Sequence, residues 1–175
     1  MWNLELIRKA VMFASKKHNG QMLTYPNDVP YSAHYFAVTL NAIELANLCD
    51  YEIDWELLIC SAILHDTIED TPTSFEEVSE NFGEKIANGV LALTKDSKLE
   101  KTEQMRDSLE RIKKQPKEIA IVKIADRLFN ISGRVLSWSK EKQECYKKEA
   151  QIICDELGYV SEKVREKLQN QIDKY

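Results

Sequence analysis

The sequence predicts an all-α protein, a compact bundle of several helices. Of its 175 residues, 43% are apolar and 30% are charged, and only 5 are Gly and 4 are Pro, so turn-forming residues are too few for a many-stranded β protein. Apolar residues recur at the three- and four-residue intervals that are typical of amphipathic helices. The length suits one hydrophobic core, and we expect residues 1–175 to form a single domain.

Two helices are predicted in the N-terminal part of the chain. The apolar face of the first helix continues, after Ala14, with His18. The polar ring of His18 therefore points toward the element that this helix packs against. A turn-rich loop runs to Pro30, and Tyr31–Leu48 is again periodic, with His34 in its first turn. The apolar stripe of the first helix consists of Leu4, Ile7, Val11 and Ala14.

The middle of the chain contains a helix, Trp55–Leu64, that is apolar on nearly every side. Such a helix is expected where other helices surround it. It ends abruptly in the polar segment His65–Asp70. The segment Ser74–Glu77 fits a capping box that opens a short helix, and Gly83 separates this helix from another, from about Glu84 to Leu93.

A second helix that is apolar on all sides is predicted in the C-terminal half. Pro116 stands just before it, and its core, Ile119–Ala125, is expected to be central in the fold. Asp126 follows that core directly. The segment Thr94–Lys101 is the most polar of the chain, and no element is predicted between it and Pro116.

Two amphipathic helices, Trp138–Leu157 and Val160–Ile172, are predicted at the C-terminal end. Gly158 separates them, and their polar outer faces are expected to cover the bundle. We interpret Trp138 and Tyr146 as core residues.

The charge balance excludes some classes of partner. Lys and Arg number 24 against 29 Asp and Glu, a net charge of -5, so the protein as a whole should repel nucleic acid and anionic membranes. The longest apolar run is far shorter than the ~20 residues of a membrane span. Charged residues interrupt the N-terminal segment, where a signal peptide would have a continuous apolar stretch. The four cysteines show no CxxC spacing, so we expect reduced thiols and a cytoplasmic protein.

Polar residues beside the two most apolar helices suggest a metal site. His65 and Asp66 follow one of these helices and Asp126 lies in the other, where an uncompensated carboxylate is costly. A divalent cation would neutralise both carboxylates. Together with the imidazoles of His34 and His65, they form a mixed nitrogen and oxygen set that accepts Mn, Fe, Co, Zn or Ni. Such a site suits metal-assisted hydrolysis.

These four residues also have simpler interpretations. The pair His65 and Asp66 is consistent with a plain hydrogen bond, and His34 with a group that caps a helix. Asp126 is consistent with a structural ion pair to Arg127.

Other polar residues would surround the metal site. If the helix continues for one more turn, Glu69 and Asp70 lie four residues after His65 and Asp66, where they would act as acid or base groups. The alternative is an ordinary solvated stretch. We interpret His18 as a hydrogen-bonded support residue rather than a ligand, and Lys95 taken alone as part of a solvated face.

Six segments in the same order resemble signatures of the RelA/SpoT hydrolase domain, which belongs to the HD superfamily of metal-dependent phosphohydrolases. Six such blocks are hard to obtain by chance. They cover roughly residues 10 to 135, and the region after them is similar to the terminal helices of small single-domain members such as the metazoan SpoT homologues. The segments are Ala14–Gln21, Pro30–His34, Ala62–Thr71, Asn81–Gly83, Leu93–Lys95 and Lys123–Asn130.

This resemblance implies an HD-domain bundle that removes the 3′-pyrophosphate from the alarmones ppGpp and pppGpp with Mn2+. Glu69 and Asp70 match the pair that positions and activates the attacking water. Lys95 and Asn130 match residues that line the nucleotide pocket, and Arg127 is expected to anchor the metal-bearing helix. The metal ligands carried over are His34, His65, Asp66 and Asp126.

The chain departs from the family around the nucleotide pocket. Met22–Thr24 stand where the family usually carries a basic pair after Gln21. Ser132 and Gly133 stand where it has Arg and Thr, with Arg134 near enough to substitute.

We therefore expect a small-molecule nucleotide as substrate, with ppGpp the first candidate. One alternative is an HD phosphohydrolase that acts on ppApp, NADPH or a nucleoside monophosphate. The other is a non-catalytic nucleotide-binding module.

Overall fold

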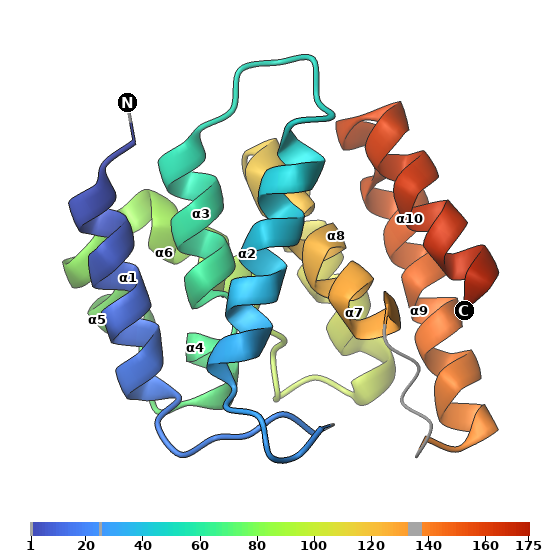
Figure 1. Ribbon diagram of the computed structural model, residues 1–175, viewed down its shortest axis with the longest axis horizontal. Helices are drawn as coiled ribbons and strands as arrows, with labels where there is room; N and C mark the ends of the chain where they lie inside the picture. Colours follow the sequence, from blue (N-terminus) through green and yellow to red (C-terminus); the bar gives the residue numbers. More distant parts are fainter. Residues whose placement is uncertain (1, 25, 133–137) are drawn as a thin grey trace.

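The computed structural model of the chain describes residues 2–24, 26–132 and 138–175. These residues form helices joined by loops, which confirms the predicted all-α fold (Figure 1). The helices are α1 (Leu4–Lys17), α2 (Ser32–Ala46), α3 (Trp55–Leu64), α4 (Thr67–Asp70), α5 (Phe75–Phe82), α6 (Glu84–Leu93), α7 (Lys101–Ile112), α8 (Lys117–Ser132), α9 (Lys140–Leu157) and α10 (Glu162–Lys174), with a short 3-10 helix at Gly158–Val160.

Helices α2, α3 and α8 form the centre of the fold, and α8 packs against both of the others. Every residue of α3 from Leu57 to Leu64 is buried, and so is every residue of α8 from Glu118 to Ala125. Runs that are apolar on nearly every side gain from burial only where neighbours cover all their faces. The prediction that these two helices are central is confirmed.

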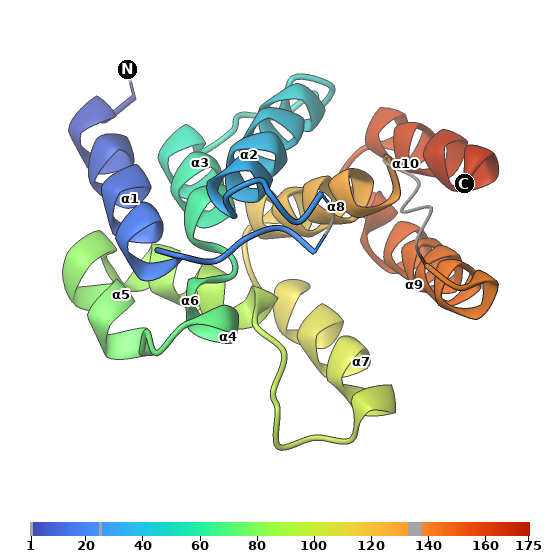
Figure 2. The ribbon, with the colours of Figure 1, turned by 60° about the horizontal axis from the view of Figure 1, so that its bottom comes forward.

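The remaining helices cover this centre. Helix α1 packs against α3, and the pair α9 and α10 packs against α8, so the two ends of the chain lie at opposite ends of the molecule (Figures 1 and 2). Helix α7 packs against α6 and α9. Across the described ranges, no helix combines the length and the apolar character that crossing a bilayer requires.

The predicted junction between α5 and α6 is confirmed. The Ser74 side chain accepts a hydrogen bond from the backbone N–H of Glu77 at 3.2 Å, which caps the start of α5. Gly83 has φ 87° and ψ 158°, a conformation that is essentially restricted to glycine. The chain therefore turns there, and α6 begins in a new direction.

Several elements differ from the prediction, among them the last helix, which begins at Glu162 and not at Val160. Helix α7 was not expected, because it is rich in charged residues and its buried face is short, with only Ser108, Leu109 and Ile112 buried. Helix α9 begins at Lys140 and not at Trp138, because the Ser139 side chain caps it.

Candidate metal centre and its cavity

Three helices bring two imidazoles and two carboxylates to one place. His34 lies in the first turn of α2, and Asp126 lies in α8. His65 and Asp66 directly follow α3. Because α2, α3 and α8 pack against one another, residues that are far apart in the sequence share one site.

His34, His65 and Asp66 form a tight cluster. The Nε2 atoms of His34 and His65 lie 3.1 Å apart. Oδ2 of Asp66 is 3.2 Å from Nε2 of His34 and 2.9 Å from Nε2 of His65. Each residue thus offers one ligand atom within 4.8 Å of the others. Imidazole nitrogens and carboxylate oxygens at these separations are a donor set that divalent transition metals bind.

Asp126 lies at the edge of this cluster. Its Oδ1 atom is 3.5 Å from Nε2 of His34 and 4.0 Å from Nε2 of His65. The Asn130 amide donates to the same Oδ1 atom at 2.7 Å, and Nζ of Lys123 is 3.4 Å from Oδ2. Two residues of its own helix, about one turn away on either side, therefore hold the Asp126 carboxylate toward the imidazoles.

Neighbours also orient the imidazole rings. Nδ1 of His65 donates a hydrogen bond to the carbonyl oxygen of Ala62 at 2.8 Å, so its Nε2 atom faces the cluster. The His34 ring meets the edge of the Phe129 ring at 4.8 Å between centroids. Both histidines are buried, which limits the positions that their rings can adopt.

The charges of the cluster shift the pKa values of its members. Burial opposes protonation of His65, but the charges of Asp66 and Asp126 outweigh it and raise the pKa of His65 to about 9. Burial also opposes ionisation of Asp66, yet His65 and His34 hold the pKa of Asp66 well below its ordinary range. The carboxylates thus stabilise a positive charge within the cluster. A divalent ion can supply that charge, so the donor set fits a bound metal.

The two carboxylates predicted to act as acid or base lie one turn beyond the cluster, on α4. The N–H of Asp70 donates to the carbonyl oxygen of Asp66 at 2.8 Å, so the chain keeps a helical turn there. Glu69 accepts a hydrogen bond from the backbone N–H of Lys95 at 2.8 Å. Burial, and then the charges of Asp66 and Glu69, raise the pKa of Asp70 above its ordinary value.

Tyr31, which was not predicted from the sequence, also belongs to this site. Its hydroxyl donates to Oδ2 of Asp66 and lies 3.3 Å from Oδ2 of Asp70. Burial and the charges of these carboxylates raise its pKa, so the hydroxyl keeps its proton. Its place three residues before His34, inside a matched motif, was the available signal.

A cavity of about 760 Å³ opens beside the cluster. Its size and its mixture of aromatic and charged walls are typical of small-molecule sites. It is lined by three of the four predicted metal ligands and by every residue predicted to act on or bind the substrate. These residues are His34, Asp66, Asp126, Glu69, Asp70, Lys95 and Asn130.

The interpretation of Trp138 and Tyr146 as core residues is wrong. Both are half-buried and line this cavity, with ring centroids 4.4 Å apart. Nζ of Lys142 lies 3.9 Å from the centroid of the Trp138 ring. Their helical spacing alone does not distinguish a core from a cavity wall. In the fold, these rings lie at 52° to each other and form an aromatic part of the cavity wall.

The two predicted supporting residues lie outside the cluster. Nδ1 of His18 donates to the Gln21 side chain at 2.7 Å, and the His18 ring stacks on the Tyr31 ring at 4.6 Å. Buried Arg127 pairs with Glu149 at 2.9 Å and therefore joins α8 to α9. An ion pair between Arg127 and Asp126, the simpler interpretation, is not the one that forms.

The departures from the family pattern fall on the wall of the cavity. Leu23 and Thr24 line it where a basic pair was expected, and Ser132 lines it on another side. Gly133 and Arg134 lie outside the described residues. The loop wall is therefore uncharged, while the cations that line the cavity within the described ranges, Lys95 and Lys123, each lie within 3.5 Å of a carboxylate oxygen.

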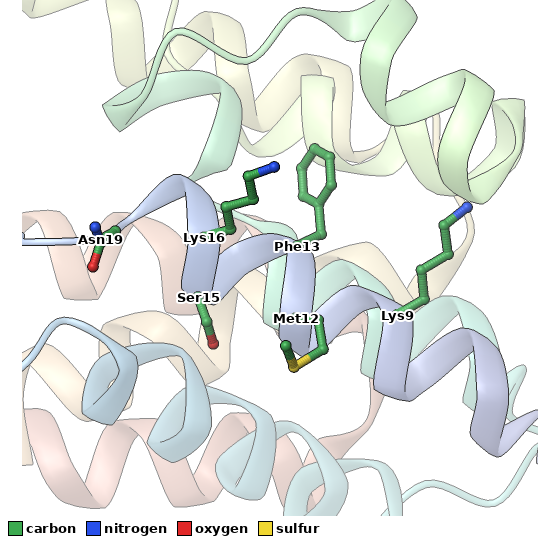
Figure 3. A pocket seen from close by; sticks show the side chains of 6 residues that line it. All are labelled: Lys9, Met12, Phe13, Ser15, Lys16 and Asn19. Atoms are coloured by element: carbon green, nitrogen blue, oxygen red, sulfur yellow. The ribbon is translucent and has the colours of Figure 1, made fainter.

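A second hollow, of about 550 Å³, lies around α1 (Figure 3). Phe13 and Lys9 point from α1 toward α5, where Phe13 meets the edge of Phe82, and Met12 points the other way. Its six lining residues include no imidazole and no carboxylate. This hollow therefore offers no donor set of the kind that His34, His65 and Asp66 form.

A helical bundle in which a His-Asp pair, a preceding His and a later Asp converge beside a cavity defines the HD class of proteins. The family model described as HD domain matches residues 10–158 of this chain. The chain therefore belongs to the HD-domain family.

Known relatives match most of its length. The guanosine-3′,5′-bis(diphosphate) 3′-pyrophosphohydrolase MESH1 of Danio rerio is 32% identical over 94% of this chain and 91% of that protein. The MESH1 protein of Homo sapiens is 32% identical over 83% of this chain and 81% of that protein. A solved structure, described as a metazoan ortholog of SpoT that hydrolyzes ppGpp, matches with a TM-score of 0.84 and 27% identity over 99% of this chain and 97% of that one. These relatives support a hydrolase activity.

Proposed function

We propose that this protein is a Mn2+-dependent hydrolase that removes the 3′-pyrophosphate of ppGpp. One observation carries the proposal: the imidazoles and carboxylates at the ends of α2 and α3 and within α8 converge beside a cavity that also contains Glu69 and Asp70. The names of the relatives that cover most of this chain support the substrate.

The four residues that would hold the metal are His34, His65, Asp66 and Asp126. A bound Mn2+ would supply a water of lowered pKa and positive charge for the phosphoryl oxygens. Mixed nitrogen and oxygen donors support Mn2+ but also accept other divalent metals, so the metal is part of the proposal.

In the proposed reaction, the oxygen of a water molecule bonds to the phosphorus attached to the ribose 3′ oxygen. The bond between that phosphorus and the 3′ oxygen breaks, and the products are GDP and pyrophosphate. Asp70 accepts the proton of the attacking water, because its carboxylate lines the cavity beside the proposed metal ligands. The 3′ oxygen takes a proton as it leaves.

The other cavity residues bind and orient the substrate. Lys95 and Lys123 place ammonium groups near the phosphates, and Glu69 holds Lys95 through the backbone N–H of that residue. Trp138 and Tyr146 offer a surface for stacking of the base. Asn130 lines the cavity, but its amide donates to Asp126, so it also orients a proposed metal ligand.

A direct assay tests this proposal. The purified protein is incubated with ppGpp, with Mn2+ and after chelation, and GDP and pyrophosphate are quantified. We expect equal amounts of the two products with Mn2+ and none after chelation. Release of monophosphate, or activity that chelation does not change, would contradict the proposed reaction.

The uncharged loop wall favours a second candidate, an HD phosphohydrolase for another nucleotide. Leu23 and Thr24 cannot attract a polyanion as a basic pair does. A nucleotide with fewer charges would therefore lose less binding affinity from the absence of that pair. The same assay with ppApp, NADPH and nucleoside monophosphates distinguishes the two candidates. Binding of ppGpp without turnover of any nucleotide would instead indicate a non-catalytic module.

A further inference from the structure

The Tyr31 hydroxyl lies between two carboxylates that have different proposed roles. It donates to Oδ2 of Asp66, the same oxygen atom that faces both imidazoles of the cluster. It also lies 3.3 Å from Oδ2 of Asp70, on the cavity side. One hydroxyl donor therefore reaches both the proposed metal ligand and the proposed base.

The Tyr31 ring is itself held in place from behind. It stacks on the His18 ring with 4.6 Å between centroids and 24° between planes. His18 donates to the Gln21 side chain at 2.7 Å, and Gln21 donates in turn to the carbonyl oxygen of Asp70 at 3.0 Å. The Tyr31 backbone N–H donates to the Gln21 carbonyl oxygen at 2.9 Å. These contacts form a closed ring around Tyr31.

The Tyr31 ring stands between two hollows. Tyr31 lines the cavity of the cluster on one side and a smaller hollow of about 240 Å³ on the other. His18 and Gln21 line that smaller hollow, so Tyr31 forms the wall between the two spaces. From this position the Tyr31 hydroxyl faces the carboxylates of Asp66 and Asp70.

We propose that Tyr31 is a positioning residue, whose hydroxyl fixes the carboxylates of Asp66 and Asp70 relative to each other. Two neighbouring carboxylates repel, and a shared donor both lowers that repulsion and selects one orientation of each group. Without the hydroxyl, Asp66 would lose a hydrogen bond on its cluster-facing oxygen atom. Asp70 would lose the nearest side-chain donor that the structure places beside its carboxylate. The part of this inference that concerns Asp70 rests on the proposed function, and the part that concerns Asp66 does not.

The variant Tyr31→Phe removes the hydroxyl and keeps the ring that stacks on His18. Tyr35→Phe is a matched control, because it removes a buried, hydrogen-bonded hydroxyl from the next turn of α2. The Tyr35 hydroxyl is paired with Ser15 at 2.7 Å and contacts none of the carboxylates of the site. The two variants lose the same group, a tyrosine hydroxyl, at two neighbouring positions, and only the hydroxyl of Tyr31 contacts the carboxylates.

Two measurements test the proposal. The first is the Mn2+ affinity of the metal-free proteins by titration, for which we expect Kd to rise by about tenfold or more in Tyr31→Phe. The second is turnover of ppGpp at saturating Mn2+, for which we expect kcat to fall by about tenfold or more, with KM within about threefold of the wild type. In Tyr35→Phe we expect both quantities to stay within about twofold of the wild type.

Equal behaviour of the two variants would overturn the proposal, because it would show that Tyr31 contributes only packing. An increase in KM with kcat unchanged would also overturn it, because Tyr31 would then contact the substrate. If the wild-type protein does not cleave ppGpp, the proposed function fails, and the Mn2+ titration still decides whether Tyr31 positions Asp66.

Discussion

Glu69 and Lys95 contact each other twice. Oε2 of Glu69 accepts a hydrogen bond from the backbone N–H of Lys95 at 2.8 Å, and Oε1 lies 3.5 Å from its ammonium nitrogen. The pair joins α4 to the segment that follows α6, at the edge of the cavity. Glu69 is therefore fixed by a partner from another part of the chain, whereas Asp70, the next residue, faces Tyr31.

Because the two carboxylates have different partners, we expect conservative substitutions of them to impair turnover for different reasons. We expect Asp70→Asn to lower kcat by about 100-fold or more, because an amide cannot take up the proton. Glu69→Gln keeps an oxygen for the Lys95 N–H but loses the charge, and we expect turnover to fall as strongly. Both variants should keep their metal, measured by elemental analysis of the purified protein. Loss of metal in either one would contradict the assigned roles.

Removal of a proposed metal ligand should cause loss of the metal, unlike the substitutions of Glu69 and Asp70. We expect Asp66→Ala to lose its metal, and its melting temperature to become insensitive to Mn2+. The wild-type protein should gain about 3 kcal/mol when Mn2+ is present at 100 times its Kd, and chelation should reverse this gain. Thermal unfolding with Mn2+ and with chelator measures both. A Mn2+-dependent shift that persists in Asp66→Ala would show that the metal binds elsewhere.

A basic residue on the uncharged loop wall should strengthen binding of a polyanionic nucleotide. We expect Thr24→Arg to lower KM for ppGpp by about fivefold, equivalent to about 1 kcal/mol, with kcat unchanged. Asn27→Arg adds the same charge to the same loop, at a residue that does not line the cavity, and serves as the control. Steady-state kinetics at low and moderate salt measure the effect. A similar decrease in KM in both variants would indicate a general effect of charge.

Removal of Glu149 should lower the free energy of unfolding more than removal of its ion-pair partner Arg127. The Arg127 side chain is 5% exposed and the Glu149 side chain 35%. Glu149→Ala leaves a buried guanidinium without its partner, and we expect a cost of about 3 kcal/mol in the free energy of unfolding. Arg127→Met leaves an accessible carboxylate, so the cost should be smaller. Urea denaturation of both variants checks the order, and the reverse order would be inconsistent with these exposures.

Gly83 should resist substitution for a purely conformational reason. Its φ of 87° disfavours any residue with a Cβ atom, although no atom beyond Gly83 and its two chain neighbours lies within 4 Å of the place that a Cβ atom would occupy. We expect Gly83→Ala to cost about 1–3 kcal/mol in the free energy of unfolding. The exposed Glu84→Ala, one residue later, should stay within about 0.5 kcal/mol. Urea denaturation checks both, and equal costs would show that the backbone conformation is not the cause.

Much of the fold was predictable because its signals are local. The all-apolar faces of Trp55–Leu64 and Ile119–Ala125 indicate burial without any knowledge of their neighbours. Helix α7 escaped prediction because its charged residues hide a narrow apolar face, which tertiary contacts with α6 and α9 are enough to stabilise. Trp138 and Tyr146 were misinterpreted because helical spacing shows only which residues share a face of a helix. It does not show whether that face packs against protein or lines a cavity.

By itself, the sequence determined most of the helices, the breaks between them and, through its resemblance to known hydrolases, the four residues expected to hold a metal. Only the tertiary structure decided which side chains from separate elements touch: Tyr31 with Asp66, and Glu69 with Lys95. The physical reason is that helix formation depends on neighbours within a few residues, whereas the direction of a hydrogen bond depends on packing between segments that periodicity does not relate.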